Sequence, residues 1–595
     1  MNKEKKKRNS FGVLKRLLSY VMRYWYLVLV AIALTLVSNQ LSLLGPKYSG
    51  EAIDAIASPN GIDLQVVEKN LLYMLVCYVV SAVTAYLLAI LMIQISQKTI
   101  SLMRQQLFTK LTKLPVSFFD KTATGDIISR MSYDIDTVNS SLSHDVIHVL
   151  TSVYTVIGSF IFMWNISKPM IAVLIITVPA SILFTRYRSK KVRPLFQKRS
   201  RKLGELNGYA EEMLSGCRTI HAYHREEEIE RRFDKKNEDT MNAYNEAEYY
   251  AAALGPSVNF INNLSLSIIM ILGGVLYMYS TSGVIKEASL FFITLGGISQ
   301  FVQYSRKFAG PINEFANMLH EFQSAFSAAE RIFRILDAEP EKEDVENAIE
   351  LTDVRGDVEF HDVVFGYVPE REILHGVSLD AMQGKTIAIV GPTGAGKTTI
   401  INLLMRFYDA NSGTITVDGK DITGLTRKSL RKAYTMVLQD TWLFHGTVFE
   451  NIAYGKEGAT LEEVKKAAKA ARIDSYIEHL PEGYDTILSD DGINISKGQK
   501  QLITIARAML SDAPMLILDE ATSNVDSRTE IKIQEALAEL MKGRTSFVIA
   551  HRLSTIQNAD LIIVLQNGQI SEQGTHDELM KKGGFYSKLY NSQFE

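Results

Sequence analysis

The chain has 595 residues, of which 47% are hydrophobic and 22% are charged, with a net charge of −2. Its mean hydropathy of +0.03 is high for a wholly soluble protein and low for one embedded entirely in a membrane, so both of these classes are excluded. The balanced charge gives no excess of basic side chains, and we expect no nucleic-acid partner.

The N-terminal segment combines positive charge with amphipathic character. Residues 3–8 are almost all Lys or Arg, and residues 11–18 place basic side chains between apolar ones. This pattern is typical of a helix that lies in the membrane interface. We therefore expect residues 1–20 to form a cytoplasmic basic tail and an elbow helix.

Six mostly apolar windows without Asp, Glu, Lys or Arg follow this segment. They cover residues 24–46, 70–97, 146–167, 169–185, 249–285 and 288–305. A helix that spans a bilayer needs about 20 apolar residues, so each window predicts one transmembrane helix, the fourth and sixth near the lower limit. We expect an α-helical six-span membrane domain over residues 21–336, embedded in the lipid bilayer.

Positive charge in the loops predicts the orientation of these helices. Lys and Arg number 8 before the first window and then 2, 6, 1, 15 and 1 in successive loops. Rich and poor loops alternate, as the positive-inside rule requires. We therefore expect a multi-pass protein of the cytoplasmic membrane with both termini in the cytoplasm. The two rich loops, 98–145 and 186–248, are long and have helical periodicity, so the helices should continue beyond the bilayer.

The windows also contain amide side chains. These are Asn39, Gln40, Asn165, Asn259, Asn262, Asn263, Gln300 and Gln303. Polar groups in a membrane domain usually face the interior of the bundle, where they join helices or contact a substrate. We expect most of these amides to join helices. The windows contain no carboxylate, which argues against transport coupled to protons.

The second half of the chain differs in composition. Residues 337–355 are charged and predict a linker that ends the membrane domain. Residues 356–595 alternate strand and helix patterns, which is typical of an α/β nucleotide-binding domain.

Within that domain, the stretch from Gly391 to Thr398 fits the pattern G-x-x-x-x-G-K-[ST]. A β-branched run at 386–390 precedes it and a helical pattern at 399–406 follows, which is the context of a phosphate-binding loop. Backbone N–H groups and the helix N-terminus bind the phosphates of ATP in such loops. Lys397 should reach the β- and γ-phosphates, and the Thr398 hydroxyl should ligate Mg²⁺. The predicted ATP-binding residues here are Gly391, Pro392, Thr393, Gly394, Ala395, Gly396, Lys397, Thr398 and Thr399.

A second strand pattern, residues 515–518, ends in the carboxylates Asp519 and Glu520. Asp519 at the tip of the strand suits a Mg²⁺ ion held through water. Glu520 suits the base that activates the attacking water. The pair predicts hydrolysis of the nucleotide as well as its binding.

Together these features resemble an ATP-binding-cassette (ABC) exporter half-transporter, and the resemblance covers essentially the whole chain. It implies a type IV exporter-like membrane domain followed by a cytoplasmic α/β P-loop ATPase domain that uses ATP and Mg²⁺. It also implies roles for further residues. These are the adenine-stacking Tyr367, Gln439 at Mg²⁺ and the attacking water, the signature residues Ser496, Lys497, Gly498 and Gln499, Asp526 in a dimer-interface loop, and His551 at the γ-phosphate.

The family resemblance further implies a dimer of half-transporters, in which each phosphate loop faces the signature of the other chain. Segments near 118–125 and 213–220 resemble the coupling helices that dock on the ATPase domains. ATP binding and hydrolysis then drive the membrane helices between inward- and outward-facing states.

The signature departs from the family pattern. The family has Leu-Ser-Gly-Gly-Gln, whereas residues 495–499 read Ile-Ser-Lys-Gly-Gln. Glycine lets the backbone approach the γ-phosphate, and Lys497 instead brings a side chain and a charge. Together with an intact Glu520, this substitution resembles one subunit of the heterodimeric bacterial multidrug exporters, whose partner has a degenerate Walker B motif. A homodimer that tolerates the substitution is the alternative.

We therefore expect ATP-driven export of hydrophobic or amphipathic small molecules, of the multidrug type, by one half of a heterodimer with one degenerate ATP site. The alternatives are a homodimeric lipid or peptide exporter and a nucleotide-gated channel or regulatory membrane protein. Glu520 and His551 favour turnover of ATP over gating.

Overall fold

The computed structural model describes residues 10–58, 61–286, 289–438, 441–488, 495–519, 526–549 and 556–594. The chain divides into two compact units. The membrane unit consists of Met1–Lys113 and Ala123–Ala338, and the ATPase unit consists of Leu114–Thr122 and Glu339–Glu595. A short segment from the first half of the chain therefore belongs to the unit formed by the second half.

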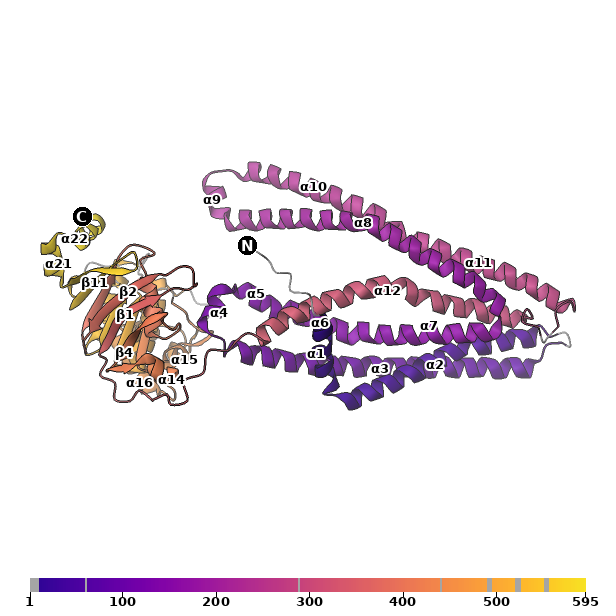
Figure 1. Ribbon diagram of the computed structural model, residues 1–595, viewed down its shortest axis with the longest axis horizontal. Helices are drawn as coiled ribbons and strands as arrows, with labels where there is room; N and C mark the ends of the chain where they lie inside the picture. The colour runs from indigo at the N-terminus through magenta and orange to yellow at the C-terminus, as the bar shows by residue number, and fades with distance from the viewer. Residues whose placement is uncertain are drawn as a thin grey trace. The chain divides into compact units, whose positions relative to one another are not determined.

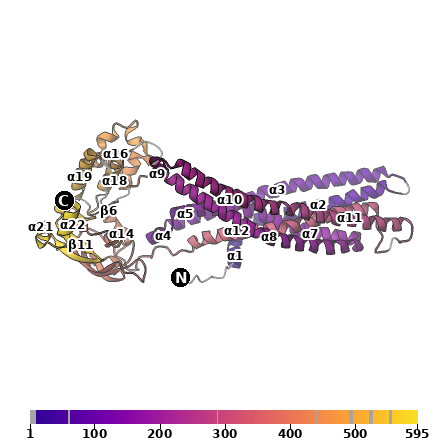
Figure 2. The ribbon, with the colours of Figure 1, turned by 90° about the horizontal axis from the view of Figure 1, so that it is seen from above.

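The membrane unit is helical (Figures 1 and 2). Its elements are α1 (Ser10–Met22), α2 (Trp25–Ile56), α3 (Leu64–Leu111), α5 (Thr124–Ser129), η1 (Arg130–Asp134), α6 (Ile135–Ser140), η2 (Ser141–Asp145), α7 (Val146–Ile166), α8 (Lys168–Ser215), α9 (Cys217–Ala222), α10 (Glu226–Ala252), α11 (Leu254–Thr281) and α12 (Leu295–Leu336). Two of these, η1 and η2, are single π-helical turns between α5 and α7. In both figures α8 and α10 run side by side and are joined by α9.

Among the described residues, five helical stretches are long and apolar enough to span a bilayer. They begin at residues 25, 64, 124, 168 and 226. Both α3 and α8 have 48 residues, which corresponds to about 72 Å at 1.5 Å per residue. That length is more than twice the ~30 Å apolar core of a bilayer, which supports the expectation that the helices continue beyond it. The helix α12, which begins within the sixth predicted window, is not among the five.

Three carboxylates hold α12 within the membrane unit. At its start, Asp54 of α2 accepts hydrogen bonds from the Thr294 hydroxyl at 2.8 Å and from the Gly296 backbone N–H at 2.6 Å. Further along, Arg331 forms a two-pronged ion pair with the buried Asp134 of η1, at 2.7 and 2.5 Å. At its end, Asp337 pairs with Arg16 of α1 at 2.7 Å.

At the start of α12, the backbones of α12 and α2 approach so closely that position 296 must be glycine. A Cβ atom on Gly296 would lie 2.0 Å from the carbonyl oxygen of Gly50 in α2. No side chain fits at that distance, so the two helices meet here backbone to backbone. The hydrogen bonds that Asp54 accepts from Thr294 and Gly296 depend on this approach.

In its described part, the ATPase unit contains two main sheets. The antiparallel sheet has the order β2-β1-β4-β5, and the larger, mostly parallel sheet has the order β12-β11-β3-β10-β9-β6. The strands are β1 (Val358–Phe365), β2 (Leu374–Ala381), β3 (Thr386–Val390), β4 (Ser412–Val417), β5 (Lys420–Asp421), β6 (Tyr434–Val437), β9 (Met515–Asp519), β10 (Thr545–Ile549), β11 (Leu561–Gln566) and β12 (Gln569–Gly574), with a separate pair β7 (Gly446–Thr447) and β8 (Ile487–Leu488).

Helices cover this larger sheet, and the apolar strands between them are buried. The helices of the unit are α4 (Val116–Lys121), α13 (Lys397–Leu404), α14 (Arg427–Lys432), α15 (Val448–Ala453), α16 (Leu461–Ala470), α17 (Asp474–Ile477), α18 (Lys497–Ser511), α19 (Ser527–Met541), α21 (His576–Lys582) and α22 (Phe585–Phe594), with 3-10 turns η3 (Ile422–Gly424) and η4 (Gly483–Asp485). Every residue of β10 is buried, as expected for a central strand of a parallel sheet that is covered on both faces.

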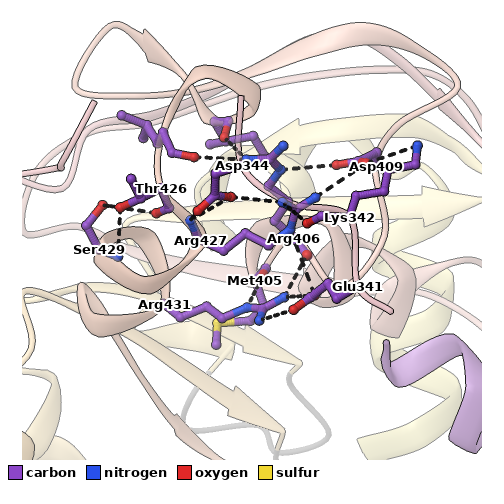
Figure 3. A network of polar contacts seen from close by, with 12 residues as sticks. Glu341, Lys342, Asp344, Met405, Arg406, Asp409, Thr426, Arg427, Ser429 and Arg431 are labelled. Atoms are coloured by element: carbon purple, nitrogen blue, oxygen red, sulfur yellow. Dashed lines mark hydrogen bonds and ion pairs between the residues drawn. The ribbon is translucent and has the colours of Figure 1, made fainter. Parts of the chain in front are cut away.

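The predicted linker is bound to the ATPase unit rather than free (Figure 3). Glu341 pairs with the Arg431 guanidinium at 2.5 and 3.1 Å, and Asp344 pairs with the buried Arg427 at 2.8 Å. Arg431 also donates to the backbone carbonyls of Met405 and Arg406, which follow α13. Glu341 is therefore held by an arginine that also satisfies carbonyl groups after α13, whereas the partner of Asp344, Arg427, donates to the linker carbonyl of Lys342.

We expect Asp134→Asn to lower the stability of the membrane unit by about 2–3 kcal/mol. This is less than the about 3–5 kcal/mol for a fully buried pair, because 42% of the Arg331 side chain is exposed. Thermal unfolding of the detergent-solubilised protein measures the effect. The control Glu330→Gln removes an exposed pair with Arg334 on the same helix and should cost less than about 0.5 kcal/mol. Equal losses in the two variants would contradict this assignment.

Candidate functional site

The predicted phosphate loop connects β3 to α13, as the sequence pattern requires. Gly394 and Gly396 have φ angles of 83° and 106°, which favour glycine. At Gly391 a Cβ atom would lie 2.3 Å from the Leu565 carbonyl oxygen. These glycines leave the backbone N–H groups and the N-terminus of α13 accessible to a phosphate, so the loop fits the triphosphate of ATP.

Lys397 is the first residue of α13, and its side chain folds back over the loop. Its ammonium donates to the carbonyl oxygens of Gly391 at 2.7 Å and Pro392 at 3.1 Å. Burial lowers the pKa of Lys397, while the negative charge of Asp519 opposes this effect. The cation therefore lies at the loop where the phosphates are predicted.

The other residues of the loop differ in exposure. Pro392, Thr393 and Thr398 are exposed, whereas Ala395 and Thr399 are buried against the domain core. An exposed Thr398 hydroxyl is available to a ligand, as its predicted role at Mg²⁺ requires.

Asp519 is the last residue of β9, and β9 is separated from β3 by one parallel strand, β10. The carboxyl ends of parallel strands lie at the same edge of a sheet, so Asp519 and the loop after β3 are neighbours. The hydroxyl of Thr398 and the carboxylate of Asp519 are oxygen ligands of the kind that Mg²⁺ prefers. A bound Mg²⁺ would neutralise phosphate charge there.

Tyr367 lies beside α13, and both its hydroxyl group and its ring contact other side chains. Its hydroxyl accepts a hydrogen bond from the Asn402 amide at 2.9 Å and lies 3.3 Å from the Thr399 hydroxyl. Its ring packs edge-on against Phe365 and Tyr408, with both centroid distances at 5.0 Å. A half-buried ring next to the phosphate loop is placed where an adenine could stack.

Tyr408 was not singled out by the sequence, because an isolated tyrosine after a helix carries no recognisable pattern. Its hydroxyl donates to the Asp120 carboxylate of α4 at 2.5 Å. Burial, and then this carboxylate, raise the pKa of Tyr408. The predicted coupling segment near 118–125 thus includes a residue bound to the aromatic cluster at Tyr367. The second predicted segment, near 213–220, lies at the turn between α8 and α10, where α9 forms (Figure 1).

The signature residues form the start of α18. Ser496 caps the helix by accepting a hydrogen bond from the Gln499 N–H, and the Gln499 side chain accepts one from the Ser496 N–H at 2.9 Å. Lys497 is the first helical residue and is exposed, whereas Gly498 is buried. The lysine adopts an ordinary helical conformation, so its effect on a ligand comes from the side chain alone.

Asp526 caps α19 by accepting a hydrogen bond from the Thr529 N–H at 3.0 Å. This bond lowers the pKa of Asp526. Three predicted site residues, Gln439, Glu520 and His551, lie outside the described residues, and their roles stay predictions.

Comparison with known proteins decides the family. Residues 28–299 match the model of the ABC transporter transmembrane region, and residues 374–523 match the model described as ABC transporter. A Bacillus subtilis protein, the uncharacterized ABC transporter ATP-binding protein YfiC, is 43% identical over 593 residues, covering 100% of this chain and 96% of that protein. The chain belongs to the ABC transporter family.

Two further similarities bear on this ABC transporter. A Mycobacterium tuberculosis protein, named fatty acid ABC transporter ATP-binding/permease protein, is 43% identical over 89% of this chain and 82% of its own. A solved structure of a bacterial Atm1-family ABC exporter with ATP bound has a TM-score of 0.76 and 31% identity, covering 96% and 99% of the two chains. The chain is an ABC exporter half-transporter with the type IV exporter fold, and ATP hydrolysis in its ATPase domain is coupled to transport.

We expect Tyr367→Ala to weaken ATP binding by about 1–3 kcal/mol through lost stacking on the base. Turnover at saturating ATP should change little, since the phosphate loop is intact. Titration of a fluorescent ATP analogue measures the affinity. Tyr367→Phe is the matched control: it keeps the ring, loses the bond to Asn402, and should bind nearly as the parent does. Unchanged affinity in the alanine variant would place the adenine elsewhere.

Glu520→Gln should abolish most ATP turnover and leave ATP binding intact. Removal of a general base costs about 10²–10⁴-fold in rate. Steady-state phosphate release, compared with nucleotide affinity, separates the two effects. Glu539 of α19 is an exposed carboxylate that pairs with Lys542. The control variant Glu539→Gln should therefore keep full turnover. Normal turnover in the Glu520 variant would assign the base to another residue.

Proposed function

We propose that this chain exports amphipathic small molecules from the cytoplasm as one half of a heterodimer with unequal ATP sites. Its own phosphate loop and Glu520 would form the competent site with an intact signature of the partner. The partner would be a different half-transporter with a degenerate Walker B motif. Both termini and the ATPase domain would lie in the cytoplasm.

The observation that carries the heterodimer proposal is the exposed Lys497 in the first turn of α18. The N-terminus of a helix attracts phosphate through its free N–H groups and dipole. A lysine side chain in this turn fills space that glycine leaves for the backbone to approach. Such a signature is tolerable where it completes a site that no longer hydrolyses ATP.

A second candidate is a homodimer that transports a lipid or fatty acid. The name of the Mycobacterium tuberculosis relative, at 43% identity, favours this substrate class. In that case every ATP site contains Lys497. Both candidate transporters export an amphipathic substrate. They differ in the number of sites that hydrolyse ATP.

The two candidates predict different effects of Lys497→Gly. In a heterodimer, the variant should change turnover less than about 2-fold, because the altered signature faces the inactive site. In a homodimer, restoring glycine at both sites should raise turnover substantially. The measurement is substrate-stimulated ATPase activity of the purified chain, alone and co-expressed with a candidate partner. Vigorous stimulated hydrolysis by this chain alone would contradict the heterodimer.

A further inference from the structure

A polar cavity of about 430 Å³ lies inside the membrane unit between α8, α11 and α12. Small-molecule sites in proteins usually measure about 300–1,000 Å³. The polar residues that line the cavity include Thr177, Asn259, Asn262, Asn263, Ser305 and Arg306. The described lining contains one cationic side chain and no carboxylate.

Arg306 follows Leu295, the first residue of α12, by eleven residues, which corresponds to about 17 Å along the helix axis. It comes directly after the sixth apolar window, residues 288–305. The sequence windows missed Arg306 because each window ends at the first charge, whereas the helix continues through it.

The charge on Arg306 has no protein partner among the described residues. Its side chain is exposed and faces the cavity, and it forms no hydrogen bond or ion pair with them. The next residue, Lys307, differs, because its ammonium donates to the Ser42 hydroxyl of α2 at 2.8 Å. Charged side chains in helices of a membrane domain are rare and usually face a pathway or a partner. Arg306 is therefore available to an anion.

The amides of α11 are also available. The sequence led us to expect that membrane amides join helices, and this holds for Asn39, which accepts a hydrogen bond from the Thr155 hydroxyl of α7, and for Gln300, which donates to the Lys47 carbonyl of α2. In contrast, the side chains of Asn259, Asn262 and Asn263 form no hydrogen bonds within the described structure. Three unpaired amides and a guanidinium thus converge on one cavity.

We propose that this cavity binds the anionic head group of an amphiphile, either a carboxylate or a phosphate ester. The guanidinium of Arg306 can bind such a group through two parallel hydrogen bonds, and amide N–H groups of α11 can donate to its remaining oxygens. Leu174, Val178 and Leu266, which also line the cavity, provide apolar surface for the first part of the alkyl chain. The inference rests on the proposed function and names the substrate class of that transporter.

The test measures binding of palmitate, hexadecyl phosphate and hexadecanol to the full-length chain in lipid nanodiscs without ATP. We expect palmitate, hexadecyl phosphate or both to bind at least about 10-fold more tightly than the neutral alcohol, and the tighter one identifies the source of the head group. Equal affinity for all three probes would overturn the proposal.

Variants then assign the binding to the cavity. Arg306→Gln should weaken binding of the anionic probe about 10-fold and leave binding of hexadecanol unchanged, and Arg306→Lys should restore part of the loss. Lys307→Gln removes the neighbouring charge, which is directed at α2, and should bind as the parent does. Equal losses in the Arg306 and Lys307 variants would contradict the proposal. Asn262→Leu provides a second variant if Arg306→Gln fails to fold, and unchanged affinity there would count against the cavity.

The design separates this inference from the proposed function. Binding of the probes is measured without ATP. If the chain prefers anionic probes but ATP drives no transport, the proposed function fails and the head-group site stands. ATP-driven transport of amphipathic molecules without such discrimination would leave the proposed function standing and refute the head-group site.

Discussion

The membrane unit depends on α12 being one continuous helix that carboxylates fix at its start and near its end. Within a bilayer the backbone must satisfy its own hydrogen bonds, so a spanning segment has to be helical throughout. That requirement fixes the form of α12 but not its position. Asp54 supplies the position at the start of the helix, and the pairs Arg331–Asp134 and Arg16–Asp337 supply it near the end.

The same helix leads directly into the contacts that hold the linker. A few residues after Asp337, Glu341 and Asp344 bind Arg431 and Arg427 of the ATPase unit. Arg431 also satisfies carbonyl groups after α13, the helix that begins with Lys397. The linker that follows α12 is therefore held by ion pairs within the ATPase unit, one of them to an arginine that also binds the chain after α13.

A second set of contacts lies at Tyr367, the residue predicted to stack on adenine. Asp120 of α4 accepts a hydrogen bond from Tyr408, and Tyr408 packs against Tyr367. A ligand that stacks on Tyr367 would contact the same aromatic cluster that holds α4. The aromatic cluster at Tyr367 thus contacts α4, whereas the linker is held at the end of α13 opposite to the phosphate loop.

Much of the nucleotide site could be predicted because its signals are local. The strand before Gly391 was predicted at 386–390 and is found as Thr386–Val390, and the loop chemistry follows from glycines at fixed spacing. Contacts between distant segments could not be predicted in this way. The sequence showed the linker only as a charged stretch, because no local sequence pattern indicates that Glu341 forms an ion pair with Arg431. The π-helical turn that carries Asp134 likewise has no sequence signature, and its buried pairing with Arg331 depends on helix packing.

The helical membrane domain and the P-loop ATPase domain were both predicted correctly, whereas the position of Arg306 at the polar cavity was not predicted. Hydropathy windows treat a charge as the end of a span, although a helix can carry a charge where a cavity receives it. The exclusion of carboxylates from the windows was informative, but the same procedure hid the one cation that faces the polar cavity.

The most direct test of the account is transport against a gradient in inverted membrane vesicles that contain the chain. ATP should drive accumulation of a labelled amphipathic substrate inside the vesicles above its external concentration, and Glu520→Gln vesicles should only equilibrate. If ATP merely accelerates equilibration in both, without accumulation, then ATP gates a passage and the chain is not an exporter.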